Sequence, residues 1–201
     1  MSKKGFIGIL IVGAIFIAAG VGTMLFAFRG NEIGHLYAND AIVTFNATEV
    51  KGLYSIPSTG VRIDRTTNTI EFYGSKILIN VIASPENGSM YSFGVYGLVN
   101  PTIKVRKDAL VTIQLINADD DMYHGLVITE GAPPYPYMGT MMFDRPVFFN
   151  SYIQPLSYER NGEYRGASAV FTASVSGTFY YICQVIGHAS KGMYGKFIVK
   201  D

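Results

Sequence analysis

The sequence is short of the residues that build disulfides and strongly charged surfaces. It has one cysteine and three histidines in 201 residues, and only 15% of its residues are charged. A single cysteine excludes an intrachain disulfide. The net charge is +1, so the chain does not have the excess of lysine and arginine that marks a nucleic-acid-binding protein. We therefore expect no nucleic acid among its partners, and a weakly charged domain with few carboxylates to neutralise in acidic surroundings.

One long stretch without charge stands at the N-terminus. Residues 5–28 carry no charged side chain, and Lys3 and Lys4 precede them. About 20 apolar residues cross the hydrocarbon core of a bilayer, whereas the apolar part of a signal peptide has about 7–15. The length favours an uncleaved transmembrane helix as a single-pass anchor over residues 1–29. The small residues at positions 18–20 leave a cleaved signal as the alternative.

This anchor sets the expected domain organisation. Lysines ahead of an apolar segment hold the N-terminus in the cytoplasm, so the rest of the chain is expected on the periplasmic or extracellular face of the cell membrane. Residues 30–42 are short and polar and form the expected linker. Residues 43–201 remain as one folded domain, which is long enough for a single core.

Short apolar runs, separated by Gly, Pro and Asn, fill this domain. Their number and spacing are typical of an all-β sandwich. Thr69–Tyr73 and Lys76–Ala83 flank Gly74 and Ser75 and predict a hairpin. The other expected strands are 103–105, 110–116, 125–129, 147–153, 167–175, 177–183 and 194–200.

Two further features predict local structure. Asn46 or Thr48 is expected to cap a short helix that runs to Tyr54 and ends before Pro57. Tyr181 lies within a strand close to a glycine, and its hydroxyl is expected to fix a strand corner.

The only cysteine lies near the C-terminus, between two apolar runs. In Phe179–Lys200, FYYICQVIGHASKGMYGKFIVK, Cys183 is followed by His188 and then by Met193. The flanking runs predict two strands joined by a loop that carries these side chains. One thiolate and two imidazoles in a trigonal plane, with a weak and distant thioether, suit copper that changes between its two oxidation states.

A second histidine must come from elsewhere in the chain. His35 lies just beyond the N-terminal apolar segment, which makes it a poor candidate, whereas His124 stands at the start of a strand beside a polar loop. The sequence therefore predicts one copper ion held by His124, Cys183 and His188, with Met193 as the axial ligand.

Simpler interpretations exist for each of these residues taken alone. A lone cysteine is usually a small, buried apolar residue, and a lone methionine needs no role beyond packing. Zinc accounts for Cys183 and His188 but gives the methionine no role. Met138, Met141 and Met142 stay open as alternative axial ligands. The spacing C-x4-H-x4-M between two strands favours copper.

The C-terminal loop resembles the copper loop of the cupredoxins, the type 1 blue copper proteins. Within that family, YICQVIGHASKGMYGKFIVK is most similar to the rusticyanins and then to the sulfocyanins. Two more segments share the resemblance, NPTIKVRKDALVTIQLIN from Asn100 and GAPPYPYM from Gly131 to Met138. The resemblance runs from about Thr44 to Asp201 and is strong from Asn100 onward.

The resemblance implies a cupredoxin-like Greek-key β-sandwich and the same four ligands. One position departs from the family. Many cupredoxins have Asn or Ser directly after the first histidine, where it hydrogen-bonds the neighbouring loop, but Gly125 stands there in this chain. The groups around the thiolate are therefore expected to differ, and with them the reduction potential.

The resemblance also implies a function. It is the transfer of single electrons in an extracytoplasmic respiratory chain, linked to ferrous iron oxidation in an acidophile, with a cytochrome or terminal oxidase as redox partner. Copper stays bound and no small-molecule substrate is ligated, so the protein is not expected to be an enzyme. The electron is expected to pass through His188, partly surrounded by the apolar stretch between Pro133 and Phe143.

Other functions make different predictions. Multicopper oxidases and copper nitrite reductases need further histidines, and a dinuclear copper domain needs two cysteines, so the residue counts argue against catalysis. A copper-binding or chaperone module without a redox role remains the alternative and predicts a colourless Cu(I) site. A purely structural membrane-anchored domain predicts no metal.

Overall fold

The computed structural model describes residues 41–57, 59–138 and 145–201. The predicted anchor over residues 1–29, all but the last two residues of the predicted linker, and His35 lie outside the described residues. Within the described ranges, no helix is both long and apolar enough to span a bilayer.

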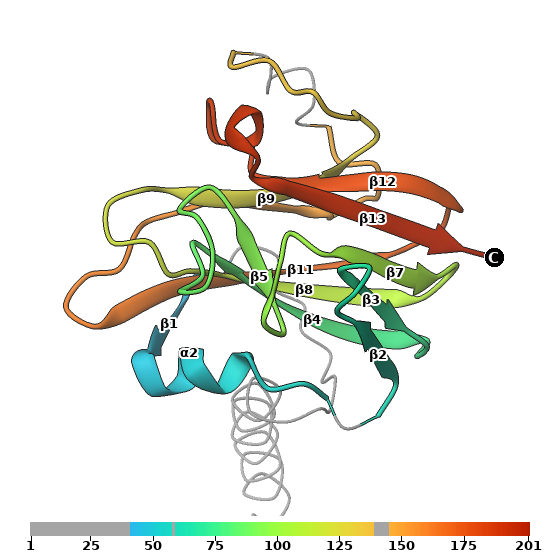
Figure 1. Ribbon diagram of the computed structural model, residues 1–201, viewed down its shortest axis with the longest axis horizontal. Coiled ribbons are helices and arrows are strands. Elements are labelled where there is room, and N and C mark those ends of the chain that lie inside the picture. The colour runs from blue at the N-terminus through green and yellow to red at the C-terminus, as the bar shows by residue number, and fades with distance from the viewer. Residues whose placement is uncertain (1–40, 58, 139–144) are drawn as a thin grey trace, which may run out of the picture. The chain divides into compact units, whose positions relative to one another are not determined.

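Two β-sheets form the described part of the chain, which confirms the predicted sandwich (Figure 1). The six-stranded sheet has the order β1 (Val43–Asn46), β11 (Glu163–Thr172), β8 (Leu110–Asn117), β4 (Lys76–Ala83), β5 (Phe93–Val95) and β6 (Leu98–Val99). The seven-stranded sheet has the order β10 (Tyr152–Leu156), β9 (His124–Thr129), β12 (Gly177–Ile182), β13 (Tyr194–Lys200), β7 (Thr102–Arg106), β3 (Thr69–Phe72) and β2 (Val61–Asp64). Strands that are adjacent in a sheet are often distant in sequence, as in the parallel pairs β4–β8, β3–β7 and β7–β13.

The core lies between the two sheets and takes side chains from the inward face of each. Along β13 every second residue is buried, which is the period of a strand with one covered face. Phe148 stacks on Phe171 with 5.4 Å between ring centroids and meets Phe179 edge-on. Phe197 is fully buried beside them. Truncating such a side chain to alanine costs about 3–5 kcal/mol, so this aromatic cluster is a main source of stability.

The predicted hairpin is wrong, although both of its strands exist. β3 pairs with β2 and β7 in the seven-stranded sheet, whereas β4 pairs with β5 and β8 in the other sheet. Gly74 and Ser75 therefore carry the chain from one sheet to the other. Ile70 of β3 and Ile79 of β4 belong to the same core cluster. The alternation of apolar residues showed two strands, but it does not specify which sheet each strand joins.

One predicted strand begins later than expected. Residues 147–151 form a turn ahead of β10, because Asn150 has a φ of +67° and Ser151 donates both its N–H and its hydroxyl to the Phe148 carbonyl. An extended strand cannot include a residue in that left-handed conformation. The paired residues therefore start at Tyr152 and continue to Leu156.

The two predictions of local structure are confirmed. Helix α2 (Ala47–Leu53) begins after Asn46, whose side chain accepts the Glu49 N–H while the Glu49 carboxylate accepts the Asn46 N–H. This reciprocal pair satisfies two backbone donors at the helix start. The hydroxyl of Tyr181 donates to the Pro101 carbonyl at 2.6 Å and so ties β12 to the start of β7.

Strand register gathers three segments at one end of the seven-stranded sheet. Ile182, the last residue of β12, lies opposite Val127 of antiparallel β9 and opposite Tyr194 of antiparallel β13. The start of β9, the residues after β12 and the residues before β13 therefore meet at this end. The loop from β12 to β13 contains a single 3-10 turn, η1 (Ala189–Lys191), drawn in red in Figure 1.

Candidate metal centre

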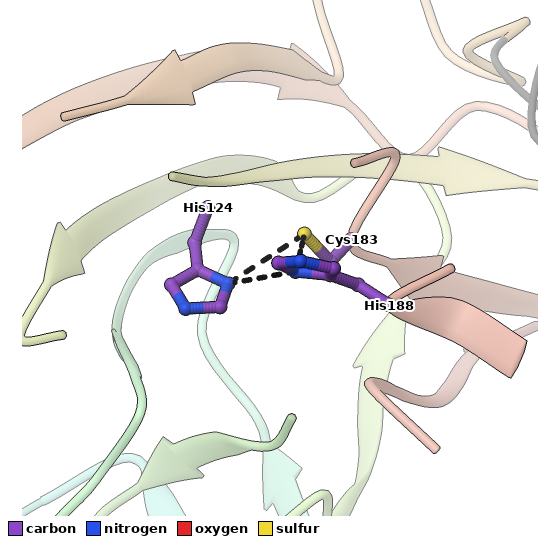
Figure 2. Close-up of side chains that lie close together, drawn as sticks. All are labelled: His124, Cys183 and His188. Carbon is purple, nitrogen blue, oxygen red and sulfur yellow. Dashed lines mark hydrogen bonds between the residues drawn. The ribbon is translucent and has the colours of Figure 1, made fainter. Parts of the chain in front are cut away.

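Three of the predicted ligands turn their ligand atoms toward one another (Figure 2). The Nδ1 atoms of His124 and His188 lie 3.9 and 3.5 Å from Sγ of Cys183, and the two Nδ1 atoms are 3.1 Å apart. All three residues are buried. The sequence separates His124 from Cys183 widely, and the pairing of β9 with β12 closes that distance.

This arrangement fits a single metal ion. Bonds from a first-row metal such as zinc to nitrogen and sulfur are about 2.0–2.3 Å long, so three ligands in a plane around one ion lie roughly 3.5–4 Å apart. The observed separations of 3.1 to 3.9 Å are close to that range. One soft sulfur and two imidazole nitrogens form the donor set that suits both oxidation states of copper.

Cys183 follows β12, and the backbone fixes its position. Its N–H donates to the Met193 carbonyl at 3.0 Å, which extends the β12–β13 pairing by one residue. Burial raises the pKa of the thiol to about 12, and the N–H groups of Gly125 and Val185, which donate to the sulfur, oppose that rise. Because the thiolate is the metal ligand, binding must displace the thiol proton.

His124 is the first residue of β9 and is completely buried. Its Nε2 atom lies 3.0 Å from Oδ2 of Asp119. A carboxylate partner places the ring proton on Nε2 and leaves the Nδ1 lone pair directed toward Cys183. Burial lowers the pKa of His124, while the hydrogen bond that its Nε2–H donates to Asp119 acts against this change. For Asp119, burial raises the pKa, but the hydrogen bonds from His124 and the loop outweigh it and bring the value to about 2.

His188 lies in the loop ahead of η1, nearer the surface than His124. Gly187 before it has a φ of +82°, and the Tyr137 ring occupies the space that a Cβ would need. Gly187 also donates its N–H to the Tyr137 carbonyl. The ring of Tyr91 meets the His188 ring edge-on, with 5.2 Å between centroids. Burial is the main reason that the pKa of His188 falls to about 4.

Met193 stands immediately before β13, with its backbone tied to two predicted ligands. Its carbonyl accepts the Cys183 N–H, and its own N–H donates to the His188 carbonyl at 3.1 Å. The residue is fully buried, in the same core cluster as Cys183. Among the alternative axial residues, Met138 is 72% exposed, and Met141 and Met142 lie outside the described residues.

Sequence reasoning missed three residues around the site. Asp119 comes five residues before His124, in a run of three aspartates that gave no sign of which one would turn inward. Tyr91 comes from the segment ahead of β5, which is distant in sequence from both ligand loops, although its ring contacts His188. Gln184 lies beside Gly125, where a Cβ would come within 2.8 Å of its side-chain carbon. For Gln184, the sequence signal was the glycine at position 125, because a residue without a Cβ leaves room for a neighbouring side chain.

Two sheets packed as a sandwich, with one thiolate and two imidazoles converging at one end, define the cupredoxin class of copper proteins. Comparison with known proteins agrees with this class. The structure matches that of rusticyanin from Thiobacillus ferrooxidans with a TM-score of 0.71 and 25% identity, over 81% of this chain and 99% of that one. The fold also matches that of reduced rusticyanin, with a TM-score of 0.69 and 24% identity over 80% of this chain and 100% of that one.

The chain belongs to the sulfocyanin (SoxE) domain family, whose model matches residues 65–201. Rusticyanin from Acidithiobacillus ferrooxidans is 30% identical over 133 residues, which are 66% of this chain and 82% of that protein. Sulfocyanin from Sulfolobus acidocaldarius is 24% identical over 123 residues, or 60% of this chain and 61% of that protein.

Family membership confirms the predicted cofactor. His124, Cys183 and His188 form the cluster that holds the metal, and with Met193 buried in the same core cluster as Cys183 they match a type 1 copper site as in rusticyanin. The relatives are electron carriers rather than enzymes, which agrees with the prediction that this chain is not an enzyme. A carrier of this class implies redox proteins as partners.

Proposed function

We propose that the protein carries single electrons in a respiratory chain outside the cytoplasm, linked to ferrous iron oxidation in an acidophile. Its domain over residues 43–201 holds the copper, residues 30–42 act as the linker, and residues 1–29 anchor it to the cell membrane. The observation that carries the electron-transfer proposal is the convergence of His124 Nδ1, His188 Nδ1 and Cys183 Sγ within 4.8 Å of one another in a buried site.

The four ligands take different roles in this proposal. Bound copper supplies a one-electron couple. Cys183, His124 and His188 provide the three strong donors, and Met193 provides the weak axial thioether, the set that suits both oxidation states. Their backbones are held by strand pairing and by the hydrogen bonds that link Cys183, Met193 and His188. Ligands fixed in this way move little when the charge of the site changes, which favours fast transfer.

The route for the electron follows from which ligand approaches the surface. His124 is completely buried, whereas the His188 ring is 6% exposed and lies in a loop with exposed neighbours, among them Ile186 at 54% and Tyr137 at 59%. An apolar surface of this kind excludes water. It also suits the small, short-lived interfaces that redox proteins form with one another. We infer that the electron passes through the imidazole of His188 to a cytochrome or terminal oxidase.

The position outside the cytoplasm rests on the sequence. Residues 5–28 carry no charge and follow two lysines, which supports a single-pass segment with its N-terminus in the cytoplasm. Fractionation of cells that express the full chain tests this. The full chain is expected in the membrane fraction and a variant that lacks residues 1–29 in the soluble fraction. Recovery of a shortened full chain in the soluble fraction would support a cleaved signal instead.

Redox titration of the copper-loaded full chain at acidic pH tests the function. The oxidised protein is expected to be blue, to lose its colour on reduction, to recover it on oxidation, and to show a high midpoint potential. Ferrous iron added at acidic pH is expected to bleach the oxidised protein. A modest potential without bleaching would favour a generic carrier, and a colourless site without reversible redox chemistry would favour a copper-binding or chaperone module.

The axial role of Met193 has its own test. Met193→Leu is expected to retain copper and colour but to raise the midpoint potential, because the loss of a thioether donor destabilises the oxidised ion more than the reduced ion. An unchanged potential would transfer the axial role to Met138, Met141 or Met142.

A further inference from the structure

Asp119 is a buried carboxylate on the far side of His124 from the metal centre. It lies in the loop between β8 and β9 and is 3% exposed. Its Oδ2 atom accepts from Nε2 of His124 at 3.0 Å. Its Oδ1 atom accepts the N–H groups of Asp121 and Met122, both at 3.0 Å. The two oxygens therefore have separate partners, one in the metal site and one in the loop.

A second set of hydrogen bonds holds the loop that carries Asp119. The Asn117 side chain accepts the Asp119 N–H at 3.0 Å and donates to the carbonyls of Met122 and Leu156. The Asp119 carbonyl accepts the Glu159 N–H, which fixes the loop to the chain beyond β10. The carboxylate is thus positioned by the backbone of two loops and does not depend on the metal for its place.

The negative charge is not needed to build this loop. An asparagine side chain has one oxygen that accepts backbone N–H groups in the same turn. Burying a carboxylate away from water is unfavourable unless it is paired and hydrogen-bonded. Within the described residues, its only side-chain partner with an opposite or potential positive charge is His124. The charge therefore acts on His124 and on whatever His124 binds.

We propose that Asp119 is a positioning residue for the copper site, which fixes the ring of His124 with Nδ1 toward Cys183 and places a permanent negative charge behind it. This proposal rests on the proposed electron-transfer function and deepens it. A negative charge in a poorly solvated position stabilises the more positive oxidised ion over the reduced ion. Asp119 therefore lowers the reduction potential below the value that the four ligands alone would give.

The test compares two aspartates of one loop in the copper-loaded full chain. Asp119→Asn keeps the shape and one oxygen that accepts the loop N–H groups, but it removes the buried charge and the second oxygen, which accepts from Nε2 of His124. Asp120→Asn removes an equal charge from a neighbouring exposed side chain, where solvent screens it. At a fixed applied potential, Asp119→Asn is expected to increase the ratio of reduced to oxidised protein at least tenfold, about 59 mV for one electron. Asp120→Asn is expected to change it less than twofold, and equal changes in the two variants would overturn the proposal.

A measurement on the metal-free full chain keeps the proposal testable if Asp119→Asn fails to hold copper. Nitrogen NMR of the imidazole of His124 distinguishes its tautomers. The wild-type chain is expected to carry the proton on Nε2, and a proton on Nδ1 would overturn the positioning role. If the wild-type chain binds copper without a blue band, the proposed function fails. If the band forms but the potential does not respond to Asp119→Asn, only this inference fails.

Discussion

The two histidine sides of the metal centre are built in opposite ways. His124 begins a strand, is completely buried and has the Asp119 carboxylate directly behind its ring. His188 lies in a loop and has no carboxylate against its ring in the described structure, where its aromatic neighbour is Tyr91. Lys191 places its ammonium 4.2 Å from the centre of the Tyr91 ring. The His124 side is thus held by a strand and carries a negative charge, whereas the His188 side is apolar and has the Lys191 ammonium at its edge.

This contrast separates two requirements of a redox centre. The ligands must stay in place while the charge of the site changes, and the electron must still reach the surface. The His124 side meets the first requirement with strand pairing and a charged hydrogen bond. In the proposed route the His188 side meets the second, because Ile186 and Tyr137 near it are exposed. Each of the following changes acts on one side or on the sulfur that the two sides share.

Removing the shared sulfur has the largest expected effect. Cys183→Ala is expected to abolish the blue absorption, because the thiolate-to-copper transition that produces the colour disappears with the sulfur. The small side chain leaves the β12–β13 pairing intact, so circular dichroism should show a folded sandwich. An absorption spectrum after copper loading provides the measurement, and retained colour would refute the ligand assignment.

Removing the two imidazoles one at a time tests the difference in access. His188→Gly and His124→Gly are each expected to lose the blue band. Each variant removes one imidazole, and the two strong donors that remain do not enclose the ion. Added imidazole is expected to restore the band in His188→Gly, whose cavity opens near the surface. The same imidazole concentration should restore little in His124→Gly, because that cavity is enclosed by the sheet and by Asp119. Equal recovery in both variants would contradict the contrast.

The ligand set could be predicted from the sequence because it depends on residue counts and on one local motif. With three histidines and one cysteine in the whole chain, few combinations exist. The strands β9, β12 and β13 were expected close to where they lie, since each shows a clear apolar run between turn residues. These three strands are also the ones that hold the site.

The pairing of β3 and β4 and the residues around the ligands could not be predicted, because they depend on contacts between segments that are distant in sequence. The hairpin prediction for β3 and β4 failed because apolar alternation is the same in either sheet. Asp119 is one of three consecutive aspartates, and only the fold shows that its oxygen meets His124. Tyr91 is separated from His188 by almost half of the chain, and no local pattern links the two rings.

A charge placed on the His188 side is expected to slow electron transfer without changing the copper site. Ile186→Lys puts an ammonium on the 54% exposed residue two positions before His188. Two copies that approach through this side would then repel each other, and the rate of electron self-exchange measured by NMR is expected to fall about tenfold at low salt and to recover partly at high salt.

The control for this variant lies at the other end of the sandwich. Val175→Lys adds the same charge at a residue of equal exposure, 55%, beyond the start of β12. It is separated from the site by the length of that strand, roughly 20 Å at 3.3 Å per residue. Its self-exchange rate should stay near that of the wild type. A comparable loss of rate in both variants would show that the His188 side is not the contact surface.

The smallest expected effect concerns the packing of the His124 side. A Cβ at position 125 would lie 2.8 Å from the side-chain carbon of Gln184, whose amide donates to the Ile153 carbonyl at 2.7 Å. Gly125→Ser is therefore expected to destabilise the metal-free protein by about 1–3 kcal/mol, the usual effect of overpacking.

In the double variant Gly125→Ser/Gln184→Ala, the serine has room, so its destabilising effect should largely disappear. Gly52→Ser is the matched control, since a Cβ there meets nothing within 4 Å. Urea unfolding of the wild type, Gly125→Ser, Gln184→Ala, the double variant and Gly52→Ser measures the coupling, and additive changes would show that Gln184 does not occupy the space that Gly125 leaves.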